Sequence, residues 1–562
     1  MRRGPQLLSL KHLLALMLAC INLALGTNAC SQDASPTQSV IEASIREIVL
    51  TGSLADLRWP DFSDYKSIVE EFYNQSRYEP AWIHGSELSI QALSMIEMFK
   101  QARGQGLLPD DYDASRWDDR LAKLHHAQTD IARVDVALTV CTMRFVSDLR
   151  IGRVNPRHFK FGLSVEQKKY DLAQFLRDRI LPSSDPSSLV ETIEPPFPGY
   201  RHTRAALARY VEMAAKDDGE QLVIPLKPVD PGQAYASIPR LTRLLMLLGD
   251  LSREAAPIGD GQLYDSALAG AVMRFQKRHG LKDDGRLGTD TLKQLNVPIS
   301  DRIQQLQLAL ERWRWLPSEF SAPPIVVNIP DFRLRALDES NKVALEMRVV
   351  VGKSLRTQTP VFSRDMTYVV LRPYWNVPPS ILRGEIVRAI ERDRNYIANK
   401  RYEVTTGNGE VVTSGAISDD VLAQLKAGRL SVRQKPGPTN ALGLVKLMFP
   451  NEFNVYLHST PAPELFSRTR RDFSHGCIRV EKPAELTAWV LRNNAGWPIE
   501  RIEQSMSTGA NNVTVTLKQR VPVFIVYATA LAYENDEVHF YDDIYGHDRK
   551  LAEALAKGYP YP

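Results

Sequence analysis

The stretch Val455–Val480, VYLHSTPAPELFSRTRRDFSHGCIRV, indicates both the fold and the chemistry of this chain. A short apolar strand ends at His458, a polar loop follows, and Ser474-His475-Gly476-Cys477 leads into a second strand-like run. A thiol attacks a carbonyl as the thiolate, which needs a neighbouring base or cation. The stretch therefore holds a candidate nucleophile, Cys477, and two candidate bases, His458 and His475.

The residues just before the thiol are candidates for supporting roles. Gly476 permits a backbone turn, so that the amide N–H groups of Gly476 and Cys477 can point at a developing oxyanion. We expect His458 to be the general base, and its imidazolium to stabilise the thiolate. His475 is the competing base, or it shapes the oxyanion pocket and the loop. Ser474 either bonds within the loop or contacts a substrate.

Strand alternation predicts further residues on the same face. Arg479 lies two positions beyond Cys477, where it either binds a substrate carboxylate or pairs with a buried acid such as Asp472. Tyr456 lies two positions before His458 and is predicted to line the pocket, with core packing as the alternative.

A cysteine near histidines can also be structural or bind a metal. Cys477 can be a buried free thiol beside two surface histidines. The same three side chains could in principle bind zinc. A conventional zinc site needs a further carboxylate or cysteine at short spacing, and the sequence has none there, so we predict no metal.

The stretch resembles the signature of the bacterial L,D-transpeptidases with a YkuD-type catalytic domain. That signature is a histidine, a loop, and then Ser/Thr-His-Gly-Cys-x-Asn/Arg. Each position is filled here, by His458 and by the run Ser474 to Arg479. His458 and Cys477 are 19 positions apart, which also fits the family. The resemblance implies Cys477 as nucleophile and His458 as its base.

The resemblance also implies a reaction. The cysteine would attack the carbonyl of the third residue of a peptidoglycan tetrapeptide stem and release D-alanine. The acyl group would pass to the side-chain amine of a third residue on another stem, which gives a 3→3 crosslink in cell wall biogenesis and cell shape. The resemblance implies that this reaction needs no cofactor. Carbapenem-type β-lactams would acylate the same thiol. Cell-wall synthesis enzymes are the implied protein partners.

Three alternatives to this reaction remain open. An L,D-carboxypeptidase would use water as the acceptor, and a peptidoglycan–lipoprotein ligase would use a lysine of a protein. A wall-binding scaffold with an idle site belongs to another class of protein.

Composition and charge further limit the class of protein. A chain of 562 residues suggests two to four domains, and 44% hydrophobic with 24% charged residues indicates a globular protein. The net charge is +4, and residues 1–29 carry three basic residues and no acid. The remainder is therefore close to neutral, which gives no electrostatic case for binding nucleic acid.

The first 29 residues have the pattern of an export signal. Arg2, Arg3 and Lys11 precede the apolar run Leu13–Leu25, and a cleavage site would follow Ala29. The run is short for a membrane span, and an uncleaved inner-membrane anchor is the alternative. We therefore expect a periplasmic protein whose membrane contact is limited to this segment.

Lipidation is the other way in which this segment could anchor the chain. Neither Cys20 nor Cys30 lies in a convincing lipid-attachment box, because the third residue upstream is Met17 or Thr27. Few cysteines in an exported chain also argue against a disulfide framework.

Taken together, the patterns predict a multidomain α+β protein with a helical N-terminal half and a mainly-β catalytic domain in the C-terminal half. The predicted units are a signal peptide or anchor (1–29), a helical scaffold domain (38–235), a three-helix module (236–297), a linker helix (298–320), a catalytic domain (321–545) with a capping insertion (380–436), and a C-terminal tail (546–562).

The three-helix module resembles a peptidoglycan-binding module. Its middle helix contains Phe275-Gln276, and Asp284-Gly285 begins an Asp-Gly-x-x-Gly-x-x-Thr run that ends at Thr291. A helical spacer that does not bind glycan is the alternative.

The catalytic half alternates between strand and helix patterns. Phe332–Leu337 and Val343–Val351 predict a hairpin. The prolines of Arg372–Pro379 exclude a central strand and predict a rigid loop at a sheet edge. Within it, the resemblance implies that Trp375 forms a wall for the donor peptide and that Asn376 also binds substrate, with core packing as the alternative for Trp375. The resemblance further implies that the insertion that follows caps the active site, where it would exclude water from an acyl-thioester.

Overall fold

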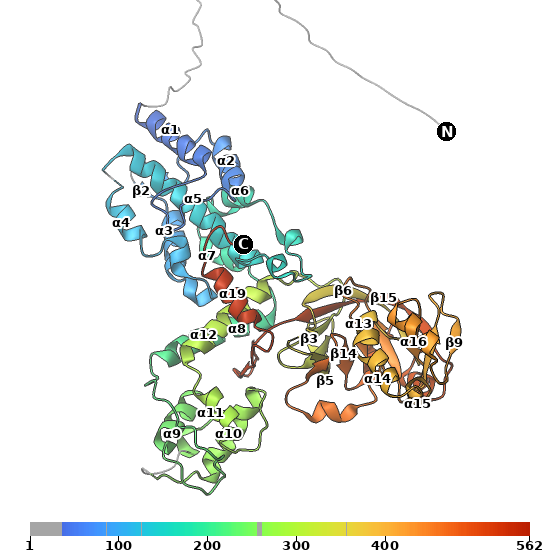
Figure 1. Cartoon of the computed structure of the whole chain (residues 1–562). Helices are drawn as coiled ribbons and strands as arrows, with labels where there is room; N and C mark the ends of the chain where they lie inside the picture. Colours follow the sequence, from blue (N-terminus) through green and yellow to red (C-terminus); the bar gives the residue numbers. More distant parts are fainter. Residues whose placement is uncertain (1–35, 86, 125, 256–260, 356) are drawn as a thin grey trace, which may run out of the picture.

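The computed structural model describes residues 36–562 except 86, 125, 256–260 and 356. The predicted signal peptide therefore lies outside the described residues. Within the described part, the N-terminal half is helical and the C-terminal half contains a large mixed sheet, which confirms the predicted α+β class (Figure 1). Among the helices described, none is long and apolar enough to cross a membrane.

The scaffold domain is built around one long buried helix, α5. Its middle turns are buried on all sides, and Cys141 lies in this core, where it behaves as a small apolar residue. The main elements are α1 (Pro36–Thr51), α2 (Lys66–Gln75), β1 (Ile83–His84), β2 (Glu87–Leu88), α3 (Ile90–Lys100), α4 (Trp117–Ala122), α5 (Gln128–Ile151), α6 (Leu172–Phe175), α7 (Pro186–Glu191) and α8 (Pro198–Ala214).

The three-helix module has its own core, and its structure explains its sequence pattern. It contains α9 (Ile238–Leu247), α10 (Ser266–Arg278) and α11 (Thr289–Leu295). The buried amide of Gln276 accepts the Gly285 N–H at 2.8 Å and donates to Thr291 Oγ1 at 3.0 Å. Gly285 has a φ of +67°, a conformation that favours glycine. The Phe-Gln and Asp-Gly residues thus fasten α10 to the turn before α11.

Helix α12 (Ile299–Arg314) links the module to the sheet domain and packs against α8. The C-terminal tail returns to this helix. In α19 (His547–Leu555), Asp548 pairs with Arg312 of α12 at 2.5 Å. Beyond α19, the Tyr561 hydroxyl donates to Asp111 of the scaffold at 2.5 Å. The tail therefore connects the linker helix α12 with the scaffold.

The catalytic domain is a nine-stranded sheet in the order β13-β5-β14-β12-β11-β6-β15-β3-β4, and an additional β4–β5 pairing closes it on itself. The predicted hairpin is confirmed by the antiparallel register of β4 and β5. The strands are β3 (Ile325–Asn328), β4 (Arg333–Leu337), β5 (Val343–Gly352), β6 (Phe362–Leu371), β11 (Val445–Met448), β12 (Leu457–His458), β13 (Asp472–Ser474), β14 (Ile478–Val480) and β15 (Val513–Val526).

Alternating apolar residues of these strands point inward and form an extensive core. Two helices, α17 (Pro483–Val490) and α18 (Ile499–Ser507), pack on this core, and a small hairpin of β16 (Ala530–Ala532) and β17 (Val538–Phe540) adjoins α8 and α12.

The capping insertion is a separate α+β unit with its own apolar core. Its four-stranded sheet has the order β7-β10-β8-β9. The elements are β7 (Trp375–Asn376), α13 (Pro379–Ile381), a π-turn η7 (Leu382–Ile386), α14 (Val387–Arg392), α15 (Tyr396–Asn399), β8 (Tyr402–Thr405), β9 (Val411–Thr413), α16 (Asp419–Lys426) and β10 (Ser431–Gln434).

The predicted boundary of the insertion needs a correction. The unit begins at Trp375 rather than at residue 380, because Trp375 and Asn376 pair with β10 as an edge strand. Only Trp375 and Asn376 form this edge strand, and the rest of Arg372–Pro378 is loop at the edge of the sheet, as predicted. Pro373 and Pro378 lie outside the paired residues, so they interrupt no strand pairing. Figure 1 shows this unit beside β5 and β14.

Candidate active site

Three adjacent strands bring the predicted catalytic residues onto one face of the sheet. In the antiparallel pair β11–β12, Lys446 lies opposite His458, and in the parallel pair β12–β14, His458 lies opposite Arg479. Directly opposed residues share a face. Lys446, His458 and Arg479 therefore form a row across the sheet, with the imidazole between two cations.

Tyr456 and Cys477 form the next row on the same face. The Ile478 N–H donates to the Tyr456 carbonyl at 3.1 Å, which fixes Cys477 beside Tyr456. The Tyr456 ring centroid lies 5.7 Å from that of His458 and 4.0 Å from Lys446 Nζ. The Cys477 thiol lies 3.6 Å from the Asn454 carbonyl oxygen. Tyr456 is thus a neighbour of the thiol, on the face that strand alternation predicted for it and His458.

His458 is held neutral by its surroundings. Its side chain is only 4% exposed, and Nδ1 lies 2.6 Å from the Ser459 carbonyl oxygen. A carbonyl only accepts, so Nδ1 carries the proton and Nε2 is the basic nitrogen. Burial lowers the pKa of His458 to about 3, and the charges of Arg479 and Lys446 contribute to this lowering.

Cys477 is a protonated thiol in the same resting state. Burial raises its pKa, and this effect is partly offset by hydrogen bonds from the Tyr456 amide and hydroxyl and by the charges of Lys446 and Arg479. The positive charge near the sulfur therefore comes from these two side chains, and not from a preformed imidazolium.

The loop before the thiol is fixed by Ser474, whose side chain is 2% exposed. Its hydroxyl donates to the Cys477 carbonyl at 2.6 Å and accepts the Gly476 N–H at 3.1 Å. The hydroxyl is thus used within the loop, which is the first of the two roles expected for Ser474. The Gly476 amide is also occupied, so only the Cys477 amide remains of the two predicted oxyanion donors. Gly476 itself has a φ of +114°.

A second layer of contacts supports this loop from the turn after β5. The Thr359 hydroxyl accepts the Gly352 N–H at 2.9 Å and donates to the Gly476 carbonyl at 2.8 Å. The Tyr545 hydroxyl donates to the Gly352 carbonyl at 2.6 Å. Sequence reasoning missed Thr359 and Tyr545, because neither belongs to a local motif.

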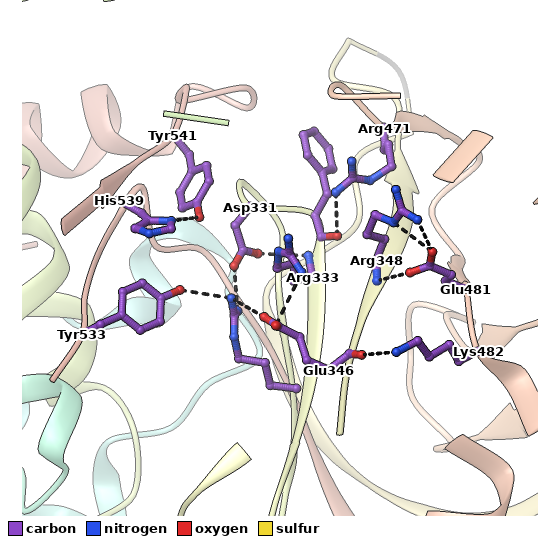
Figure 2. A network of polar contacts seen from close by, with 12 residues as sticks. Asp331, Arg333, Glu346, Arg348, Arg471, Glu481, Lys482, Tyr533, His539 and Tyr541 are labelled. Carbon is purple, nitrogen blue, oxygen red and sulfur yellow. Dashed lines mark hydrogen bonds and ion pairs between the residues drawn. The ribbon is translucent and has the colours of Figure 1, made fainter. Parts of the chain in front are cut away.

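The start of the loop is anchored by Arg471, which is buried within the polar network drawn in Figure 2. Its guanidinium donates to the carbonyls of Val349 at 3.2 Å, Phe332 at 3.1 Å and Arg468 at 2.5 Å. Burial lowers the pKa of Arg471 to about 10. No sequence signal points to this role, since Arg471 stands in a polar run that resembles a solvated loop.

The capping unit contacts the site through His475 and through Tyr456. His475 Nε2 lies 2.8 Å from Glu385 Oε1 in η7, so His475 faces the cap. This contact argues against His475 as the base of Cys477. At the second of these contacts, the Trp375 side chain forms a hydrogen bond with the Tyr456 hydroxyl, which lowers the pKa of Tyr456 although burial raises it overall. Asn376 follows in β7 and is exposed.

The partner predicted for Arg479 is engaged elsewhere. Asp472 pairs with Arg470 at 2.7 Å. Within the described residues, no ion pair involves Arg479 or Lys446, although both side chains are half-buried. Lys446 was not predicted from the sequence. Among the residues that the structure describes, no group of three or more His, Cys, Asp or Glu side chains is placed to hold a metal ion.

Comparison with protein families agrees with this architecture. Residues 323–525 match the L,D-transpeptidase catalytic domain (YkuD), residues 240–295 match the "Putative peptidoglycan binding domain", and residues 67–207 match the scaffold domain. The catalytic half of the chain is therefore similar to the YkuD-type catalytic domain of L,D-transpeptidases.

One curated relative is a protein of Haemophilus influenzae (strain ATCC 51907 / DSM 11121 / KW20 / Rd) named "Putative L,D-transpeptidase". It is 33% identical over 252 residues, which cover 45% of this chain and 50% of the relative. The chain thus spans about half the length of that protein.

Among solved structures, the chain is matched to the crystal structure of the L,D-transpeptidase (residues 123-326) from Xylanimonas cellulosilytica DSM 15894. The identity is 14%, the match covers 54% of this chain and 100% of that chain, and the TM-score is 0.15. A likeness at this score supports no conclusion about the fold.

Proposed function

We propose that this protein is an exported L,D-transpeptidase that forms 3→3 peptidoglycan crosslinks through an acyl-enzyme on Cys477. The observation that carries the proposal is the pairing of β12 with β14, which holds His458 and Cys477 on one face of neighbouring strands. A nucleophile beside a base with a fixed tautomer is the arrangement that acyl transfer requires.

The first half of the reaction forms the thioester. His458 Nε2 takes the thiol proton, and the sulfur attacks the carbonyl carbon of the third residue of a tetrapeptide stem. The Cys477 amide donates to the oxyanion. As the C–N bond to D-alanine breaks, the imidazolium returns its proton to the leaving amine.

The second half transfers the acyl group. The side-chain amine of a third residue on another stem attacks the thioester, His458 removes its proton, and the thiolate leaves and is protonated. The cap contributes by excluding water, because its contacts through Trp375 and Glu385 lie directly at the thiol loop. The reaction written in this way uses no cofactor.

Several expectations around this reaction stay predictions. Residues 1–29 would export the chain to the periplasm, the module at 240–295 would hold peptidoglycan, and Trp375 with Asn376 would contact the donor peptide. Export is tested by fusing residues 1–40 to alkaline phosphatase, whose activity requires the periplasm. An inactive fusion that is made in normal amounts would remove this part of the proposal.

The reaction is tested with a tetrapeptide donor and intact mass spectrometry. We expect the parent to gain the mass of a tripeptide acyl group while free D-alanine appears, and Cys477→Ala to gain nothing. A well-folded parent that stays unmodified would favour the alternative function, a wall-binding protein with an idle active site.

The acceptor is identified by adding stem peptides and a lysine-bearing lipoprotein peptide to the same reaction. Stem-to-stem dimers are expected. Release of free tripeptide alone would identify an L,D-carboxypeptidase, and labelling of the lipoprotein peptide would identify a ligase.

A further inference from the structure

On the catalytic face, Lys446 and Arg479 have no ion-pair partner among the described residues. Lys446 and Arg479 lie on either side of His458, on β11 and β14. Both are half-buried, and the ion pairs of the described residues include neither of them. The negative charge of Glu464 raises the pKa of Arg479, but the Glu464 side chain is exposed in the 3₁₀ turn η8 (Pro463–Ser467) and forms no ion pair with it.

Such an arrangement is costly for the protein alone. A half-buried charge loses hydration, and proteins usually compensate for this with a carboxylate. The Lys446 ammonium has the face of Tyr456 as a compensating contact, at 4.0 Å from the ring centroid. The acids close in sequence do not help, because Asp472 is paired with Arg470. The missing counter-charge is therefore expected from a ligand.

The two cations also oppose catalysis when the site is empty. Proton transfer from Cys477 to His458 would place an imidazolium between two positive side chains, which is unfavourable at the spacing of adjacent strands. A bound anion beside the row would remove much of this penalty. The ligand that supplies the anion would thus promote the proton transfer that starts its own acylation.

We propose that Lys446 and Arg479 form a carboxylate-binding subsite for the donor peptide, and that its occupation activates the Cys477–His458 pair. This inference rests on the proposed function in that the ligand is the donor stem. A stem offers two carboxylates near the scissile bond, the terminal one of D-alanine and the side-chain one of a diamino acid at the third position. Either has the chemistry that a Lys–Arg pair binds.

The subsite can be tested without any peptide by alkylating Cys477 with iodoacetate and with iodoacetamide. These reagents differ in one negative charge, and any change in thiol ionisation affects both alike. The ratio of their rates therefore reports the anion site alone. Peptide mapping of the full chain follows Cys477, with Cys477→Ala as the blank for other thiols.

We expect the iodoacetate-to-iodoacetamide ratio of the parent to exceed that of glutathione. It should fall about fivefold in Lys446→Met, because one unit charge is removed near a half-exposed site. Lys446→Arg keeps the positive charge, so it should retain the ratio. This control separates the loss of charge from the effect of any substitution at position 446. Lys518→Met, on the exposed side of β15, is the matched control and should not change it. A ratio that stays within twofold of the parent in both Lys446→Met and Arg479→Met overturns the proposal.

A second experiment identifies which carboxylate is bound. Acylation rates are measured for a donor with both carboxylates free, for its C-terminal amide, and for a donor amidated at the third residue. Amidation of the recognised carboxylate should lower kcat/KM about tenfold in the parent and about twofold in Lys446→Met. Equal rates for all three donors would contradict the proposal.

The outcomes separate this inference from the proposed function. If the alkylation ratio depends on charge but no donor acylates the protein, the carboxylate-binding subsite is supported and the transpeptidase activity is rejected. If a donor acylates the protein but the ratio does not depend on charge, the transpeptidase activity is supported and the subsite is rejected.

Discussion

Replacement of Ser474 by alanine tests how the thiol is positioned. The change leaves two groups of the loop without their partners, the Gly476 N–H and the Cys477 carbonyl, which now lie 3.1 and 2.6 Å from the serine oxygen. Each buried group that loses its hydrogen bond costs about 1–3 kcal/mol. The sum is about 2–4 kcal/mol, since part of the loop can relax toward water.

The cost should appear partly in stability and partly in rate. If half of it displaces Cys477 from its reactive position, acylation by a donor or a carbapenem slows by about 5- to 30-fold, at about 1.4 kcal/mol per factor of ten. The melting transition of the catalytic domain should fall by about 2–4 °C for each kcal/mol that is lost globally.

The assay is the pseudo-first-order rate of adduct formation by intact mass, beside a thermal scan. Ser474→Thr is the matched control, because its hydroxyl can make both hydrogen bonds, and it should stay within threefold of the parent. Acylation of Ser474→Ala within threefold of the parent would refute the idea that this hydroxyl holds the nucleophile in place.

Three further predictions concern the base, the turn and the cap. The lowered pKa of His458 means that between pH 6.5 and 4.5 the unfolded chain binds a proton there that the folded chain does not, so acid destabilises the fold. The parent should therefore lose about 2 kcal/mol more than His458→Gln over that range in urea unfolding, and equal losses would contradict the assignment. A Cβ at Gly352 would lie 1.9 Å from a backbone carbonyl oxygen, so Gly352→Ala should cost about 3 kcal/mol or more, whereas Gly384→Ala, with open space, should cost little. Glu385→Gln weakens the contact with His475 and should shorten the lifetime of the acyl-enzyme two- to fivefold without changing iodoacetamide alkylation; an unchanged lifetime would show that this contact does not restrain the cap.

Sequence alone could predict those parts of the fold that depend on a pattern of neighbouring residues. The hairpin of β4 and β5 has two alternating runs and a polar turn, and the module at 240–295 has its Gln276 and Gly285 at fixed spacing. The small sheet of the cap was missed. Its strands have two to four residues each, too few for a period of two to stand out from helical patterns on either side.

The same distinction holds for the site. Cys477 and His458 could be found because they belong to one continuous signature. Lys446 and Thr359 could not, since each reaches the site through strand pairing or a turn far away in sequence. Their side chains carry no motif, and only the register of β11 with β12, or the fold of the turn after β5, places them there. Ser474 was recognised, but its two hydrogen bonds depend on backbone geometry that the sequence does not specify.

The measurement that tests the central claim most directly is the intact mass of the full chain after incubation with a carbapenem, beside Cys477→Ala and His458→Ala. We predict a single drug adduct on the parent, no adduct on Cys477→Ala, and slower adduct formation on His458→Ala. A folded parent without an adduct, or an adduct that persists in Cys477→Ala, would contradict the assignment of Cys477 as the nucleophile.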